Sequence, residues 1–198
     1  MPNTYFITLA SQNHCGVLPA VTTALGELGG NMQHASQSIV NGLFTMTIAA
    51  RFPEHRTREV IRDHLLQAGR YYDMKVMIRE IASEDFEETV IGQSYFLTVS
   101  GRDAPGVVRV ISSMLAEQMI SIESLSAVPD SPETFSMVMN VTLPPNVDFD
   151  DLVTELETFG SLNGLAISLT EEEEFYRSGA EANPALRNYA RNLPDPLR

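Results

Sequence analysis

Two short loops of the chain carry side chains whose types and spacing suit the binding of a small zwitterion. Each loop contains a glycine and runs into a predicted helix, where unpaired N–H groups and the positive end of the helix dipole favour a carboxylate. Asn13 or Asp103 can accept hydrogen bonds from an ammonium group at the other end of the ligand. The candidate site residues are Asn13, His14, Cys15, Gly16 and Val17 in the first loop, and Asp103, Ala104, Pro105, Gly106 and Val107 in the second.

Each of these residues also has a purely structural interpretation. Asp103 can cap the helix that follows it, and Asn13 can serve as a turn residue. Gly16 and Gly106 form turns whether or not a ligand is present. The argument for a binding site is that the same residue types recur together at the same place in both loops.

Three further candidates open the strand that follows each of these helices. Asn31-Met32 begins one strand and Ser121 begins the other. We expect Asn31 to reach the ligand across a domain interface, although it can also hold the bend after Gly29-Gly30. Since the second loop lacks this asparagine, we expect the first loop to be the better site.

The elements that position both loops belong to an internal repeat. At an offset of 90 residues, Tyr5-Phe6-Ile7-Thr8-Leu9 matches Tyr95-Phe96-Leu97-Thr98-Val99, and the offset becomes 91 from Phe44 and Phe135 onwards. Matches spread over about 80 residues indicate a tandem duplication. The one extra residue of the second copy coincides with a longer predicted turn, at residues 129–132.

Each copy is predicted to fold as strand, helix, strand, strand, helix, strand. Alternating apolar residues mark the strands, and apolar residues three or four apart mark the helices. Asn41-Gly42 predicts a tight hairpin, and Gly69 and Gly160 are expected just past the second helix of each copy. This order predicts an α+β fold of two ferredoxin-like βαββαβ units, each an antiparallel sheet with both helices on one face.

We expect four segments along the chain. Residues 1–82 form the first domain, 83–92 an acidic linker, 93–169 the second domain, and 170–198 an acidic tail that contains three prolines.

The two loops resemble the ligand loop of ACT domains, in which the first strand leads into Asp-x-Pro-Gly and a hydrophobic residue, and the second strand opens with Asn-Ile. Residues 103–107 match this pattern in full, whereas the first copy has Asn13 for the acid and Cys15 for the proline. The resemblance covers about residues 4–169. It implies small-molecule sensing in amino-acid metabolism, with no cofactor and with glycine or a serine-like amino acid as the ligand.

Two ACT copies without a catalytic domain are most similar to the glycine cleavage system transcriptional repressor family. The first copy also resembles the ACT module of formyltetrahydrofolate deformylase. The first resemblance implies a non-enzymatic regulator of transcription or one-carbon metabolism that contacts a protein partner and forms homo-oligomers. The alternatives are an interaction module without a ligand, and the regulatory subunit of a separate enzyme.

Composition excludes several other classes of function. The chain of 198 residues carries 13 basic and 26 acidic residues, a net charge of −13, which disfavours nucleic acid and anionic membranes as partners. Most of this charge lies on residues 92–169. No stretch has the roughly 20 apolar residues of a membrane span. With one cysteine and no basic residue before Arg51, we expect a reduced, cytoplasmic protein.

Other reactive side chains have weaker support. Cys15 beside His14 can be a redox-sensing thiol or a small loop residue, and neither has partners at metal-binding spacing. Arg56, Arg58 and Arg62 form a cationic cluster that can meet an acidic partner or make salt bridges with nearby acids. We therefore predict no catalytic residues and no metal site.

Overall fold

The computed structural model describes residues 3–81 and 91–178 of the chain, which divides into two compact units, residues 1–88 and 89–198. The predicted linker at 83–92 lies mostly outside the described residues, as does the predicted tail beyond residue 178. The first unit contains β1 (Asn3–Gln12), α1 (Val17–Glu27), β2 (Asn31–Val40), β3 (Leu43–Phe52), α2 (Arg58–Ala68), the 3₁₀-helix η1 (Arg70–Tyr72) and β4 (Lys75–Ile81). The second contains β5 (Gln93–Arg102), α3 (Val107–Glu117), β6 (Ser121–Ser131), β7 (Thr134–Leu143), α4 (Phe149–Asn163), β8 (Leu165–Glu171) and α5 (Glu172–Ser178).

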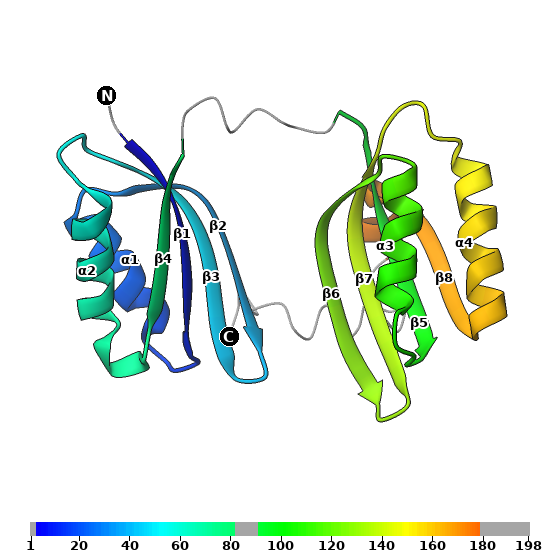
Figure 1. Ribbon diagram of the computed structural model, residues 1–198, viewed down its shortest axis with the longest axis horizontal. Coiled ribbons are helices and arrows are strands. Elements are labelled where there is room, and N and C mark those ends of the chain that lie inside the picture. Colours follow the sequence, from blue (N-terminus) through cyan, green and yellow to red (C-terminus); the bar gives the residue numbers. More distant parts are fainter. Residues whose placement is uncertain (1–2, 82–90, 179–198) are drawn as a thin grey trace. The chain divides into compact units, whose positions relative to one another are not determined.

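Each unit is a four-stranded antiparallel sheet with two helices on one face, as predicted (Figure 1). The strand orders are β2-β3-β1-β4 and β6-β7-β5-β8, so the first strand of each repeat lies inside its sheet. The helices bury the predicted apolar positions against that sheet. The buried side chains of the helices include Val21, Leu25, Ile61 and Leu65 in the first unit, and Ile111, Leu115, Leu152 and Leu156 in the second.

The two hairpins show where the repeats differ by one residue. Asn41 and Gly42 both have positive φ, at 50° and 77°, as the predicted tight turn requires. The longer turn predicted at 129–132 is wrong, because Pro129 to Ser131 continue β6 and the turn has two residues, like its counterpart. The extra residue is a β-bulge at Asp130, where the pairing shifts between Pro129 and Ser131.

The second helix of the second unit is longer than predicted. Gly160 lies inside α4 and not beyond it, and the helix ends at Gly164, with φ at 68°. A Cβ on Gly160 would lie 2.8 Å from the backbone oxygen of Leu165, so this glycine allows α4 to approach β8 closely. In the first unit the corresponding Gly69 caps α2, as predicted, and η1 follows.

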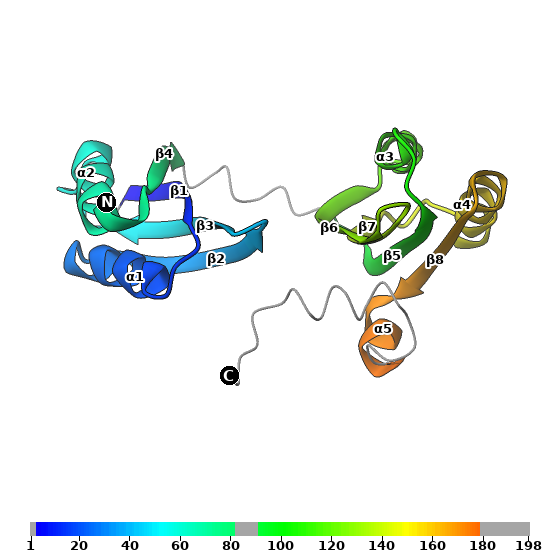
Figure 2. The same ribbon diagram turned by 90° about the horizontal axis from the view of Figure 1, so that it is seen from below.

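The segment predicted as a tail from residue 170 begins inside the fold. Thr170 and Glu171 complete β8, and α5 then packs on the sheet face opposite α3 and α4 (Figure 2). Phe175 stacks on Phe96 with ring centroids 3.8 Å apart, and Val138 completes this small cluster. The packing of Phe175 was not predicted, because the run of four glutamates at 171–174 is typical of an exposed tail.

Within the two described ranges, no helix is both long enough and apolar enough to cross a bilayer.

Candidate functional site

The two candidate loops are held in the same way in both units. The backbone N–H of Asn13 donates to the oxygen of Gly42 at 2.9 Å, and that of Asp103 donates to the oxygen of Glu133 at 2.8 Å. Each loop is therefore fixed to the turn of the neighbouring hairpin. Gln12 and Arg102, the last residues of β1 and β5, pair with the residues that begin β3 and β7. The repeat thus builds two equivalent loops, each at the same end of its sheet.

The glycine of each loop begins the helix that follows. Gly16 and Gly106 are the N-cap residues of α1 and α3, with φ of 101° and 94°, a conformation that residues with a Cβ rarely adopt. Neither helix has a side-chain cap at its N-terminus. The interpretation of Asp103 as the helix cap is therefore wrong, and its exposed carboxylate makes no hydrogen bond within the described residues.

At the first loop, the space above the glycine is occupied by an aromatic side chain. A Cβ placed on Gly16 would lie 2.8 Å from the hydroxyl oxygen of Tyr72, and the Tyr72 and His14 rings are 6.4 Å apart. Pro19, in the first turn of α1, has no N–H to offer a ligand. This loop has neutral polar groups and little room.

The second loop opens on a hollow of about 470 Å³, within the roughly 300–1,000 Å³ typical of small-molecule sites. Asp103, Ala104, Pro105, Gly106 and Val107, the five predicted residues, all line it. The rest of the wall consists of residues that the sequence analysis did not single out: Val108, Ala127, Val128, Pro129 and Phe135. Val108 directly follows the predicted loop on α3, whereas the other four lie on β6 and β7, which reach the loop through the hairpin and not through sequence spacing.

Two backbone donors at this loop are without a backbone partner. In the described residues, the N–H groups of Val108 and Arg109 make no backbone hydrogen bond, whereas Val107 bonds Ala104 and Val110 bonds Gly106. The nearest atom to a Cβ placed on Gly106 is Nη2 of Arg109, at 3.9 Å. Val108, whose amide has no backbone partner, and Asp103 both line the hollow, and the Arg109 guanidinium lies near Gly106.

The strand-opening candidates lie away from the loop of their own unit. Asn31 pairs with Arg51 and Ser121 pairs with Thr142, at the end of the sheet where β1 and β5 begin. A strand of ten residues separates that end from the loop, about 30 Å at 3.3 Å per residue. Asn31, Met32 and Ser121 therefore do not contact the loop of their own unit.

The reactive pair in the first loop shows no catalytic arrangement. Nε2 of His14 lies 3.2 Å from Oε1 of Gln12, and Cys15 is exposed without a hydrogen-bond partner among the described residues. Over the same residues, no group of three or more His, Cys, Asp or Glu side chains is placed to hold a metal ion.

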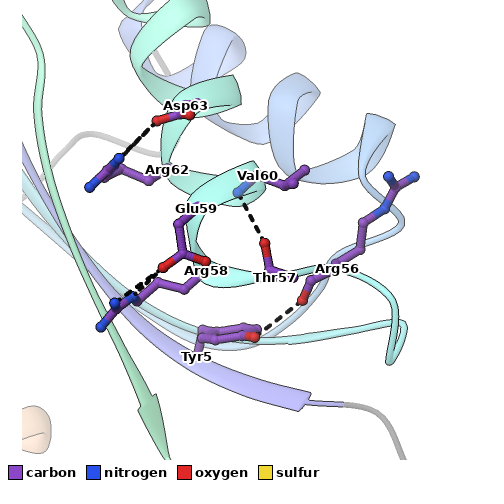
Figure 3. A network of polar contacts seen from close by, with 8 residues as sticks. All are labelled: Tyr5, Arg56, Thr57, Arg58, Glu59, Val60, Arg62 and Asp63. Atoms are coloured by element: carbon purple, nitrogen blue, oxygen red, sulfur yellow. Dashed lines mark hydrogen bonds and ion pairs between the residues drawn. The ribbon is translucent and has the colours of Figure 1, made fainter.

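Two arginines of the cluster are paired with acids of α2, and the third, Arg56, precedes that helix (Figure 3). Arg58 contacts Glu59 at 3.1 Å and Arg62 contacts Asp63 at 3.2 Å, while Nε of Arg56 donates to the oxygen of Leu28. The backbone N–H of Glu59 itself and then the Arg58 guanidinium lower the pKa of the Glu59 carboxyl. Of the two interpretations left open by the sequence, local salt bridging is the one that the contacts support.

The tyrosine near the start of each first strand, Tyr5 in β1 and Tyr95 in β5, has different surroundings in the two units. Tyr5 is buried and its hydroxyl donates to the oxygen of Arg56 at 3.1 Å. Tyr95 lies 5.2 Å from the ring of Phe149, and burial together with the negative charge of Glu171 raises its pKa. Both tyrosines lie at the sheet end remote from the loops.

Comparison with known proteins supplies two relatives of unassigned function, while no family model matches the chain. A UPF0237 protein of Clostridium acetobutylicum is 36% identical over 80 residues, which are 40% of this chain and 89% of that protein. A UPF0237 protein of Corynebacterium glutamicum is 42% identical over 48 residues, 24% of this chain and 54% of that protein. The chain therefore spans about half the length of the second relative.

Solved structures share the fold over most of the chain. A protein of unknown function from Galdieria sulphuraria superposes with a TM-score of 0.71 at 20% identity, covering 86% of this chain and 99% of the other. A "putative glycine cleavage system transcriptional repressor" superposes with a TM-score of 0.63 at 14% identity, covering 87% and 99%. At these identities the matches show the fold, two βαββαβ units in tandem.

Proposed function

The chain belongs to the UPF0237 family and folds as two ACT domains, and on that premise we propose that it is a non-enzymatic regulatory protein that binds amino acids at its loops. The observation that carries the proposal is the hollow at the second loop, lined by Asp103 and Gly106. There the ammonium of an amino acid meets a carboxylate, and the ligand carboxylate meets the amides of α3 and Arg109.

The first loop is proposed as a site for a smaller ligand, glycine or serine. The Tyr72 hydroxyl above Gly16 limits the room. Asn13, His14 and Cys15 offer no fixed negative charge. We propose the second loop as the better amino-acid site, in place of the first loop that the sequence favoured, because Asp103 and Arg109 offer it charged partners.

The regulatory step is proposed to run through contacts between proteins. We place the protein in the cytoplasm, as a homo-oligomer that contacts a transcription regulator or a metabolic enzyme. Asn31, Met32 and Ser121 are exposed or half-exposed on the edge strands β2 and β6, where another unit can bring them to a loop. A ligand that favours one arrangement of units changes the affinity for the partner by the same coupling free energy.

Isothermal titration of the full chain with a panel of amino acids tests the proposal. We expect at least one to bind, and Asp103→Asn to weaken it roughly tenfold or more, because a hydrogen bond to a charged group is worth about 1.5–3 kcal/mol. Asp151→Asn is the matched control, since it removes the same charge from α4, at the other end of the unit, and should leave binding unchanged.

Two results would contradict the proposal. If no amino acid binds, the chain is an interaction module without this ligand or the subunit of a separate enzyme. If Asp103→Asn binds as tightly as the wild type, the ligand lies elsewhere. Retention of proteins from a cell lysate with and without saturating ligand then tests whether binding changes partner contacts.

A further inference from the structure

We infer that the hollow at the second loop selects an amino acid with an aliphatic side chain, of valine to leucine size, over glycine and serine. The inference rests on the proposed function, because it concerns the ligand of that same site. The proposed function gives partners to the two charged groups of an amino acid. The opposite wall of the hollow takes no part in that binding.

That wall is apolar and comes from three different elements. Val108 lies on the first turn of α3, Ala127 to Pro129 lie near the end of β6, and Phe135 lies near the start of β7. Val108 is 41% exposed, and Ala127 and Pro129 are also exposed. Apolar surface that stays in contact with water next to a charged loop is stabilised when a ligand covers it.

The polar groups of the hollow fix which way a ligand lies. Asp103 and the amides of Val108 and Arg109 stand at the loop and hold the two charged groups on the ligand's α-carbon. With these groups bound at the loop, the side chain of the ligand points away from the loop, toward Ala127 and Val128 on β6. Glycine would leave this surface uncovered, and serine would place a hydroxyl against it without a partner.

The size of the hollow follows from how the second helix of each repeat ends. In the first unit α2 stops at Ala68, and the 3₁₀ turn that follows places Tyr72 over Gly16. In the second unit α4 continues through Asn163, the residue equivalent to Tyr72, and its side chain donates to the oxygen of Phe159 in the same helix. No side chain in the described part of the second unit covers Gly106 in the way Tyr72 covers Gly16.

A homologous ligand series measures the selectivity. Titrations of the full chain with glycine, serine, alanine, valine and leucine should show affinity rising about fourfold for each buried methylene, since about 0.8 kcal/mol per methylene converts at 1.4 kcal/mol per tenfold. We expect leucine or valine to bind at least roughly tenfold more tightly than glycine.

Paired substitutions locate this selectivity. Val108→Ser makes the wall polar and should reduce the ratio of leucine to glycine affinity several-fold. Leu18→Ser is the matched control, because Leu18 occupies the equivalent position on α1 and is 40% exposed. Ala127→Leu fills the hollow from the opposite side and should weaken leucine more than glycine.

The outcomes separate this inference from the function on which it rests. Failure of every amino acid to bind overturns the proposed function. Binding that Asp103→Asn weakens, and in which glycine or serine equals leucine, overturns the aliphatic selectivity of the second loop and leaves amino-acid binding intact. An unchanged leucine-to-glycine ratio in both Val108→Ser and Ala127→Leu also overturns the selectivity, because the wall then does not contact the ligand. Thermal unfolding of each variant without ligand verifies that it is folded.

Discussion

The two loops of this protein share a scaffold and differ in what lies above them. Each has a glycine with φ near 100°, an amide bonded to the hairpin turn, and a helix of eleven residues after it. Above Gly16 is the Tyr72 hydroxyl, whereas above Gly106 is open space bordered by a guanidinium. The two repeats share the loop, and they differ at the end of the second helix, where Tyr72 of the first unit is replaced by Asn163 in the second.

The candidate site depends on three segments and not on the loop motif alone. The loop supplies the amides and the hairpin supplies the apolar wall. The end of the second helix determines how much room is left above the loop glycine. The two hairpins also differ by a one-residue bulge at Asp130, which only the second hairpin has. The Asp130 carboxylate accepts a hydrogen bond from Ser136 at 2.6 Å. Exchanging equivalent residues between the repeats therefore tests which differences matter.

The largest effect is expected where the loop meets its strand. Gly101 stands where the first unit has Ser11, and its φ is 147°. In Gly101→Ser the new Cβ would lie 2.5 Å from the backbone oxygen of Gly164, which cannot move without shifting β8. Strain and overpacking should together lower the free energy of unfolding of the second unit by about 2–4 kcal/mol, measured by urea denaturation followed by circular dichroism.

The reciprocal change is the control for this prediction. Ser11→Gly removes a buried hydroxyl that donates to the backbone oxygen of Gln12, and glycine within a strand costs about 1 kcal/mol or less. Equal losses in the two variants would contradict the idea that the repeats differ in backbone geometry here.

A smaller effect is expected at the loop glycines themselves. Gly16→Ala and Gly106→Ala should each cost about 1–2 kcal/mol, because alanine is strained at positive φ. Gly16→Ala should cost about 1 kcal/mol more, since its Cβ also displaces the Tyr72 hydroxyl, 2.8 Å away. The same urea denaturation measures both losses.

The double variant Gly16→Ala/Tyr72→Phe tests the cause of that difference. Removing the hydroxyl should bring the cost at the first loop down to that at the second. If the double variant is no more stable than Gly16→Ala, the tyrosine does not restrict the first loop.

The fold was predictable because each local signal agreed with its copy in the other repeat. Alternating Tyr5, Ile7 and Leu9 predicted a half-buried strand, and Asn41-Gly42 predicted the turn that forms. The errors arose where one signal has two meanings. Gly160 was interpreted as a helix end, but it is a point of close packing, and residues 129–132 were interpreted as a longer turn, but they contain a bulge.

The part of the candidate site that is contiguous in sequence was predictable. The five residues of the second loop were identified from their order, and all of them line the hollow. The opposite wall and the Tyr72 contact were not, because both depend on where β6 and α2 end in space. Asn31 is predicted to reach the ligand across a domain interface, and antiparallel pairing puts it at the end of its own sheet that is remote from its own loop.

The smallest effect is expected at the turn after the first helix of each repeat. Met119 has φ at 58° and is 77% exposed, and its equivalent in the first unit is Gly29, with φ at 73°. Met119→Gly should stabilise the second unit by about 0.5–1 kcal/mol, because relief of left-handed strain exceeds the entropy that glycine adds to the unfolded chain. Met119→Ala keeps the backbone strain and should give no gain, so urea denaturation of the pair separates strain from loss of the exposed side chain. A gain in Met119→Ala equal to that in Met119→Gly would mean that the exposed methionine, and not its backbone, is what distinguishes the two turns.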